Sequence, residues 1–147
     1  MKKIFLLIFI FLHFHSVSLA KNLKFSKIAS LDKPWGSSFI SNDEIIITEK
    51  SGKIKIVNII NGNVAEIKHN LNFLEYGQGG LLDILYKDNF IYVSYTENRA
   101  NWKTSTSIAK AKLDKKKLLF KNIFQANPPI DSGYHFGSRL AIKDNYL

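Results

Sequence analysis

The amino-acid sequence predicts an all-β protein, and among all-β folds it favours a β-propeller. Beyond residue 20 the apolar residues fall in short runs between Gly, Asn and Asp, without a sustained helical period. A unit made of a glycine, a strand, an Asp-containing turn and a second strand recurs three times. Each interval has room for four short strands, which is typical of propeller blades. A sandwich of meandering strands fits the strand count but does not require a recurring unit.

The first 20 residues predict a cleaved secretory signal peptide. Two lysines precede an apolar run over residues 4–12, which is short for a helix that spans a bilayer. Ser18 and Ala20 are small residues at the −3 and −1 positions of a cut between Ala20 and Lys21. An uncleaved membrane anchor is the alternative. We therefore expect a periplasmic or secreted protein that is not embedded in the membrane after cleavage, with residues 21–147 forming the N-terminal part of a single propeller domain.

The composition limits both the compartment and the partners. The chain has no cysteine, so an exported fold must be held by its core without disulfides. The formal charge is +9 over 147 residues, but the lysines are scattered apart from a run at 115–117. A dispersed charge of this kind does not form a basic stripe, and we expect no nucleic-acid partner.

The clearest secondary-structure signal is a hairpin. EIIITEK (44–50) and KIKIVN (53–58) are short β-type runs, and Ser51-Gly52 between them is typical of a tight turn. Asp114 and three lysines predict a turn after a later run. The further β-type runs are NFIYVSYTE (89–97), TSIAKAKL (106–113) and LLFKNIFQA (118–126).

The recurring unit is marked by three glycines. WGSSFISNDEIII contains Gly36, GGLLDILYKDNFIYV contains Gly80 and FGSRLAIKDNYL contains Gly137, at spacings of 44 and 57 residues. In a propeller the first strand of each blade lines the central axis, so the loops that lead into these strands meet at one end. Gln78 and His135 each lie two residues before a marked glycine. We therefore expect their side chains to face one pocket.

Three stretches of the chain resemble the soluble glucose/sorbosone dehydrogenases. They are KPWGSSFI (33–40), YGQGGLLDILYKDNFIYVSYTE (76–97) and GYHFGSRLAI (133–142), of which GQGGLLD and HFGSRL are the most specific parts. Members of that family are exported six-bladed propellers that use pyrroloquinoline quinone (PQQ). The resemblance runs from about residue 31 to the last residue. It implies a six-bladed β-propeller, of which this chain supplies about two blades and the start of a third.

The resemblance also implies roles for two residues. In the family the histidine of the second motif is the general base that acts on the sugar hydroxyl, and this role falls on His135. The glutamine of the first motif lies beside cofactor and substrate, which makes Gln78 the candidate cofactor-binding residue. Oxidation of a carbinol removes a proton, which an imidazole takes up at physiological pH, and a hydride, which the quinone takes up. The implied function is oxidation of an aldose sugar by PQQ, with electrons passed to an external acceptor.

Two departures from the family pattern bear on specificity and completeness. Tyr134 precedes the histidine where the glucose-specific branch tends to carry an acidic residue, so the chain looks closer to the broad-specificity aldose sugar dehydrogenases. The family's cofactor-anchoring Lys and Arg and its calcium ligands come from later blades. We therefore expect calcium as a second cofactor, with its ligands outside this chain and no metal ligand within it. The chain is expected to be a fragment or a truncated reading frame that carries half of an active site.

Several residues have structural interpretations that compete with functional ones. His69 in KHNLN has no motif around it and is interpreted as a surface loop residue. Arg139 suits an ion pair with Asp83 or Asp131 at least as well as a contact with substrate. The segment NRANWKTS (98–105) lengthens the second repeat, and it either borders the substrate entrance or is a tolerated insertion. For the whole chain, the alternative function is a non-enzymatic propeller that binds a carbohydrate or a protein partner, or an inactive fragment.

Overall fold

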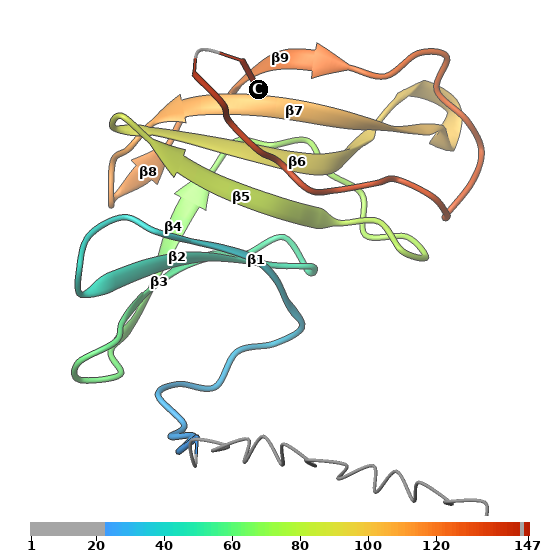
Figure 1. The fold of residues 1–147 in the computed structure, drawn as a ribbon. Coiled ribbons are helices and arrows are strands. Elements are labelled where there is room, and N and C mark those ends of the chain that lie inside the picture. The colour runs from blue at the N-terminus through green and yellow to red at the C-terminus, as the bar shows by residue number, and fades with distance from the viewer. Residues whose placement is uncertain (1–22, 145) are drawn as a thin grey trace, which may run out of the picture.

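In the computed structural model, which describes residues 23–144 and 146–147, the chain folds into nine β-strands arranged in two sheets (Figure 1). A short 3-10 turn, Ala100–Trp102, lies between two of the strands. In this described part no helix is long and apolar enough to cross a membrane. The predicted signal peptide, residues 1–20, lies outside the described residues. The predicted all-β class is confirmed.

The first sheet is an antiparallel meander of β1 (Pro34–Phe39), β2 (Glu44–Glu49), β3 (Ile54–Asn58) and β4 (Val64–His69). Isoleucines fill β2 and β3, and their branched side chains favour the pleated conformation. The hairpin predicted between these two strands is confirmed, with Ile46 opposite Ile56. Gly52 closes the turn with a φ of 100°, and a Cβ on it would lie 1.8 Å from the ring of Phe73. Glycine is therefore required at this position.

The second sheet contains, in spatial order, β5 (Leu81–Lys87), β6 (Phe90–Asn98), β7 (Thr104–Lys112) and β9 (Lys121–Gln125). β6 and β7 have nine residues each and pair along their whole length. The two sheets lie one above the other (Figure 1), with β1 and β2 in contact with β5. They share one buried core, to which both contribute aliphatic side chains such as Ile46, Ile54, Ile67, Ile84, Ile91 and Val93. Burial of these side chains is the main driving force that holds the sheets together.

β8 (Lys117–Leu118) connects the two sheets. It lies between β7 and β9 in the chain, but pairs in parallel with Lys68 and His69 at the end of β4. The side chain of Asn70 then holds Phe120, to whose carbonyl it donates at 3.1 Å and from whose N–H it accepts at 2.8 Å. The prediction of one strand over 118–126 is therefore wrong, because the first residues of that run pair with the other sheet.

A buried hydroxyl joins the first sheet to the second. Thr48 Oγ1 on β2 accepts from the N–H of Gly36 on β1 at 3.0 Å and donates to the carbonyl of Leu82 on β5. Thr48 is fully buried, so its hydroxyl satisfies backbone groups that water does not reach. We call this link the hydroxyl bridge. In it, a side-chain hydroxyl on the second strand of one repeat binds the backbone of the first strand of the same repeat and the backbone at the start of the next repeat.

The hydroxyl bridge recurs one repeat later. Ser94 Oγ on β6 accepts from the N–H of Asp83 on β5 at 3.0 Å and donates to the carbonyl of Ser138 at 2.6 Å. The two bridges align Asp83 with Gly36. The alignment expected from the sequence, in which Gly36 matches Gly80, is therefore wrong by three residues. Glycines recur where the backbone turns or approaches a neighbour closely, and such places need not keep the register of the strands.

The start of the third repeat contains no strand in the described part of the chain. Residues 136–142 cross the second sheet (Figure 1) and are held there by side chains. Thr106 donates to the carbonyl of Phe136, and Asp83 accepts from the N–H of Leu140 at 2.8 Å. The first strand predicted for this repeat is thus replaced by a segment that the second sheet positions through polar contacts.

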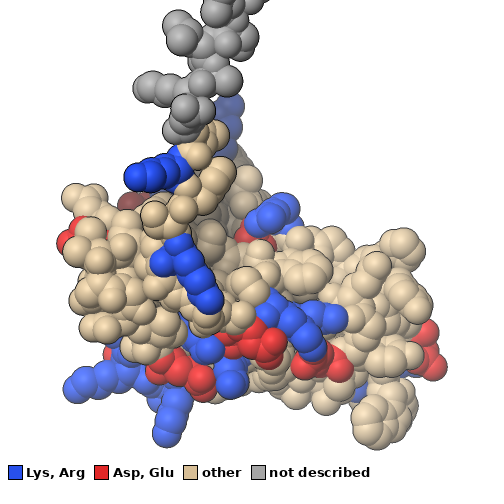
Figure 2. Space-filling view, turned by 90° about the horizontal axis from the view of Figure 1, so that it is seen from below, with Lys and Arg blue, Asp and Glu red and all other residues tan. Residues whose placement is uncertain are grey.

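The positive charge of the sequence is dispersed over the surface. On the face drawn in Figure 2, Lys and Arg side chains alternate with Asp and Glu instead of gathering into one patch. Some of these charges form exposed pairs, such as Lys33 with Glu75 at 3.5 Å. Exposed pairs of this kind contribute little to stability.

Candidate functional site

The structure brings Gln78 and His135 into direct contact. The side-chain oxygen Oε1 of Gln78 accepts a hydrogen bond from the backbone N–H of His135 at 3.0 Å, across 57 residues of sequence. The backbone N–H of Gln78 donates in turn to the carbonyl of Gly133 at 2.7 Å. The two loops therefore meet at the end of the second sheet where β5 begins. The expected meeting of these residues is present, although both are exposed and not enclosed in a pocket.

Glycine makes this close contact between the loops sterically feasible. Gly77 has a φ of 57°, and a Cβ on it would lie 2.3 Å from the carbonyl oxygen of Gly133. No side chain fits into that space. The ring of Tyr76 packs against Gly133, since a Cβ on Gly133 would lie 3.0 Å from that ring. The two sequence motifs thus pack backbone to backbone, which explains glycines in both of them.

His135 adopts a backbone conformation that is uncommon for its residue type. Its φ of 62° lies in the left-handed region, where strain in a residue with a Cβ is on the order of 1–3 kcal/mol. The hydrogen bond from its N–H to Gln78 helps to hold this conformation. The imidazole lies 6.4 Å from the ring of Tyr134, centroid to centroid, and makes no hydrogen bond to another described residue. Both ring nitrogens are therefore open to a ligand.

A buried carboxylate fixes the segment that follows His135. The side chain of Asp83 is 8% exposed, and its Oδ1 accepts from Arg139 Nη1 at 3.2 Å. Its Oδ2 accepts from the N–H of Leu140 at 2.8 Å. Of the two ion pairs considered for Arg139, the structure shows the one with Asp83. The side chain of Arg139 is 78% exposed, so the bond from the N–H of Leu140 is the contact that sets the path of the chain.

Lys50 supports the other loop. Its Nζ donates to the carbonyl of Gly77, next to Gln78, and its own carbonyl accepts from the N–H of Leu81 at 3.3 Å. A residue in the β2–β3 turn of the first sheet thus holds the loop that leads into the second sheet. The sequence around Lys50 carries no sign of this contact, because the contact depends on how the sheets stack. The bond from the N–H of Leu140 to Asp83 also depends on packing between segments, although the ion pair of Asp83 with Arg139 is one of the two that the sequence suggests.

The ring of His69 is occupied by structural contacts. Nε2 lies 2.6 Å from the carbonyl of Gly52, and Nδ1 accepts from the N–H of Leu71 at 3.2 Å. This pattern places the proton on Nε2. The ring also packs against Phe73 and Phe120. Its interpretation as a surface loop residue is wrong, since His69 is half-buried at the end of β4.

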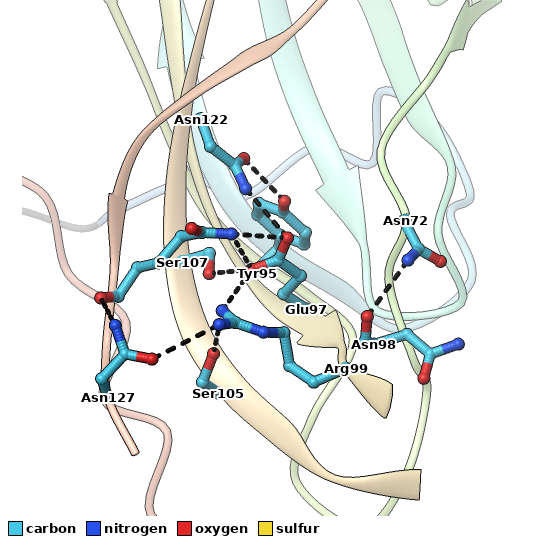
Figure 3. Close-up of polar contacts among 10 residues, drawn as sticks. Asn72, Tyr95, Glu97, Asn98, Arg99, Ser105, Ser107, Asn122 and Asn127 are labelled. Carbon is cyan, nitrogen blue, oxygen red and sulfur yellow. Dashed lines mark hydrogen bonds and ion pairs between the residues drawn. The ribbon is translucent and has the colours of Figure 1, made fainter. Parts of the chain in front are cut away.

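A polar cluster surrounds Glu97 near the end of β6 (Figure 3). The carboxylate, in a side chain 12% exposed, accepts hydrogen bonds from four side chains, namely Arg99, Ser107, Asn122 and Gln125, at 2.6–3.0 Å. Burial would raise the pKa of Glu97, but these donors and the charge of Arg99 outweigh it and lower the pKa below its ordinary value of 4.5. We call these five residues the Glu97 cluster. Because both carboxylate oxygens are satisfied, the cluster is a support and not an open ligand site.

Glu49 carries a second buried carboxylate, at the end of β2. Its Oε1 accepts from Lys55 Nζ at 2.8 Å and from the N–H of Asp32 at 2.7 Å. Burial would raise the pKa of Glu49, but these two bonds and the nearby lysines lower it below 4.5. Oε2 has no partner in the described structure. This does not make a metal site, because within residues 23–144 and 146–147 no three His, Cys, Asp or Glu residues are grouped so as to hold a metal ion.

The sequence of the chain matches a known family. The family model "Glucose / Sorbosone dehydrogenase" matches residues 31–147. The aldose sugar dehydrogenase YliI of Escherichia coli (strain K12) is 31% identical in an alignment of 119 residues that covers 75% of this chain and 32% of that protein. The chain spans about a third of the length of the curated relatives it matches.

Solved structures share the fold. The soluble aldose sugar dehydrogenase from Escherichia coli, crystallised in the apo-form, superposes with a TM-score of 0.70 at 28% identity, over 76% of this chain and 35% of that chain. The PQQ-bound form of an aldose sugar dehydrogenase from Streptomyces coelicolor gives a TM-score of 0.61 at 20% identity, over 70% of this chain and 33% of that chain. The second likeness concerns the fold alone. Together with the two sheets, the first confirms the predicted β-propeller architecture.

Proposed function

This chain belongs to the glucose/sorbosone dehydrogenase family, and we propose that it carries part of the active site of an enzyme that oxidises an aldose sugar with PQQ. The observation that carries the proposal is the hydrogen bond between Gln78 and His135. It brings the two most specific motifs together and leaves both side chains accessible. In this proposal the electrons leave through an external acceptor.

The role proposed for His135 is removal of the proton from a sugar hydroxyl. An imidazole nitrogen without a protein partner is free to form the hydrogen bond through which that proton moves. Gln78 uses Oε1 to hold the backbone of His135, so its NH₂ group is left to orient a hydroxyl or carbonyl oxygen. PQQ, when bound, supplies the acceptor for the hydride. The contact between the two residues thus couples the position of the base to that of the orienting amide.

The donor set of the described residues fits PQQ better than it fits calcium. A neutral amide and an imidazole suit the oxygens of a quinone and of a sugar. The carboxylates of PQQ need cations, and Arg139 would supply one, since its side chain is 78% exposed and only Nη1 bonds to Asp83. Calcium needs about six to eight oxygen ligands, and the described residues offer no comparable group. No step is assigned to calcium.

Export through the signal peptide is also proposed. Residues 1–20 combine a charged start, an apolar run and small residues before Lys21. Expressed in a Gram-negative host with its own leader, the protein should accumulate in the periplasm and begin at Lys21. Mass spectrometry that finds Met1 on a membrane-bound product would contradict export.

The test of the proposed function replaces His135 by asparagine. Asparagine tolerates a positive φ better than alanine does, so His135→Asn removes the base with little change to the backbone. With PQQ, an aldose and an artificial electron acceptor, the complete enzyme that carries His135→Asn should oxidise the sugar roughly 10²–10⁴-fold more slowly than the unaltered enzyme. Asp144→Asn is the matched control, because Asp144 also has a positive φ, 55°, but lies in a turn outside the two loops. The Asp144→Asn variant should oxidise the sugar at the same rate as the unaltered protein.

Two results would contradict the proposal. Equal rates for His135→Asn and the unaltered protein would reduce His135 to a packing role. Binding of sugar without oxidation, in the presence of PQQ, would favour the alternative of a non-enzymatic propeller that binds a carbohydrate.

A further inference from the structure

The hairpin between β6 and β7 carries an exposed indole. Trp102 at its tip is 80% exposed, and both Asn101 and Trp102 have a positive φ, 59° and 61°. A single exposed aromatic residue needs no explanation. The same pair of positive φ values occurs at Asp88 and Asn89 in the β5–β6 turn, where Asp and Asn tolerate it, but a tryptophan in this region is uncommon and adds strain on the order of 1–3 kcal/mol. Strain of this kind is concentrated at functional sites, which makes the tip a candidate.

The base of the tip is held by a polar network, so its shape is fixed before any ligand arrives. Arg99 donates to Glu97 at 3.0 Å, to Ser105 at 3.2 Å and to Asn127 at 3.3 Å (Figure 3). The tip is closed by a hydrogen bond from the N–H of Arg99 to the carbonyl of Lys103 at 2.8 Å. An aromatic ring presented on such a base loses little conformational freedom on binding.

The tip is connected to the loop of His135 through direct contacts. Thr104 and Ile130 exchange both backbone hydrogen bonds, at 2.8 and 2.9 Å, and Thr104 Oγ1 donates to the carbonyl of Ser132 at 3.0 Å. Ser132 adjoins Gly133, whose carbonyl receives the N–H of Gln78. In Figure 1 the β6–β7 turn and the two site loops lie at the same end of the second sheet. One surface therefore includes both the candidate site and the tip.

The side chains along this surface suit a carbohydrate. Tyr76 is 54% exposed and Tyr134 60% exposed beside the site, and Trp102 lies further along. Aromatic rings offer flat apolar faces for the C–H face of a sugar, while amides both donate to and accept from its hydroxyls. The side-chain amides of Asn98 and Asn101 make no hydrogen bond to another described residue, so both remain available.

We propose that the tip of the β6–β7 hairpin is a second sugar subsite, with Trp102 as its stacking surface and Asn98 and Asn101 as ligands for hydroxyls. This inference rests on the proposed function and names its substrate class. The reducing-end unit of an oligosaccharide reacts at His135, and a further unit lies against Trp102. The preferred substrate is then an aldose-terminated oligosaccharide and not a free monosaccharide.

The test compares the dissociation constants of maltotriose and glucose, measured by isothermal titration calorimetry. Trp102→Ala should raise the constant for maltotriose about tenfold more than that for glucose, since only the longer sugar reaches the ring. Trp102→Tyr keeps an aromatic face and should restore most of the difference. Tyr146→Ala is the matched control, because Tyr146 is 81% exposed but follows a segment that Lys87 holds at the opposite end of β5. It should leave the ratio of the two constants unchanged.

Tryptophan fluorescence provides a second readout. The chain has two tryptophans, so in Trp35→Phe the only indole is that of Trp102. Maltotriose should change its emission over the concentrations at which calorimetry detects binding. An unchanged ratio in Trp102→Ala, or an emission that stays constant while maltotriose binds, would overturn the subsite.

The two proposals fail in distinguishable ways. Normal oxidation of glucose, together with an unchanged ratio in Trp102→Ala, would overturn the subsite and leave the proposed function standing. Binding of maltotriose that depends on Trp102, without any oxidation, would overturn the function alone. If the unaltered chain binds neither sugar, the subsite is wrong, and the oxidation assay on the complete enzyme decides the proposed function. Slower reduction of a protein electron acceptor by Trp102→Ala, with the sugar ratio unchanged, would assign the tip to protein docking and overturn the subsite.

Discussion

Both sheets contain a hydroxyl bridge, but the residue whose N–H it binds on the first strand, β1 or β5, differs between them. In the first sheet Thr48 binds the N–H of Gly36, where a Cβ would lie 2.7 Å from Asp83. In the second sheet Ser94 binds the N–H of Asp83, whose carboxylate reaches forward to Leu140. In the first sheet this position has no side chain, so β5 approaches β1 closely. In the second sheet it carries the side chain of Asp83, which holds the segment around Leu140.

This difference shows that successive repeats of one scaffold are connected by different interactions. We call the connection between two successive repeats a joint. The joint between the two sheets depends on apolar packing and on close backbone approach. The joint to the third repeat, where the described residues form no strand, depends on polar side chains instead. Substitutions at the two joints should therefore differ in both size and kind.

Gly36→Asp copies the residue of the second sheet into the first and should have the largest effect. The Cβ position lies 2.7 Å from Asp83 Cα and from the backbone nitrogen of Ile84, which are not free to move aside. Overpacking and a second carboxylate beside Asp83 should lower the free energy of unfolding by about 3 kcal/mol or more, measured by urea denaturation. Ser37→Asp, at the exposed neighbouring position, is the matched control and should change it by less than about 0.5 kcal/mol. A well-tolerated Gly36→Asp would mean that the two joints are interchangeable.

Asp83→Ala should loosen the joint to the third repeat. The N–H of Leu140 loses a charged acceptor, which should lower the free energy of unfolding by about 2 kcal/mol. Arg139→Ala removes only the exposed half of the ion pair and should lower it by no more than about 1 kcal/mol. Amide hydrogen exchange over residues 135–142 should quicken in Asp83→Ala and stay nearly unchanged in Arg139→Ala. Equal exchange in the two variants would show that Asp83 does not position this segment.

Acid should produce the smallest effect, through one buried carboxylate in each sheet. Glu49 and Glu97 both have a pKa below the ordinary 4.5. A carboxylate whose pKa is lower in the folded than in the unfolded protein stabilises the fold above its ordinary pKa, and this contribution disappears as the pH falls through the folded pKa. The free energy of unfolding should therefore decline below about pH 4.5. Urea denaturation at stepped pH should show a shallower decline in Glu49→Gln and in Glu97→Gln, and an unaltered decline in either variant would contradict the role assigned to that residue.

Local patterns allow much of the scaffold to be predicted from the sequence. The β2–β3 hairpin follows from two short β-type runs around Ser51-Gly52, and the meeting of Gln78 with His135 follows from the place of each residue two positions before a recurring glycine. β8 is not predictable in this way, because two residues of it pair with a strand that lies about 50 residues earlier. The register of the repeat also differs from expectation, since it is marked by the hydroxyls of Thr48 and Ser94 and not by glycines.

Most contacts of the supporting residues could not be predicted from their sequence context. Asp83 could be named only as one of two possible partners of Arg139, and Lys50 is one of many lysines. The sequence places Glu97 only at the end of a β-type run. The role of each depends on partners from other strands, which become known only when the register of both sheets is known. A sequence pattern identifies residues of unusual chemistry, whereas positioning residues are ordinary residues in particular places.

β8 makes completion of the second sheet depend on the first. Its two residues pair with the end of β4, and β9 begins three residues later. The pairing of β9 with β7 therefore depends on the position of β4. The bond between Asn70 and Phe120 closes a loop of 50 residues, and the entropy of closing it is lost before its contacts form. During synthesis the first sheet leaves the ribosome earlier and offers β4 as a template. We expect folding to proceed in the order of the chain, with the arrival of β8 as the step that commits both sheets.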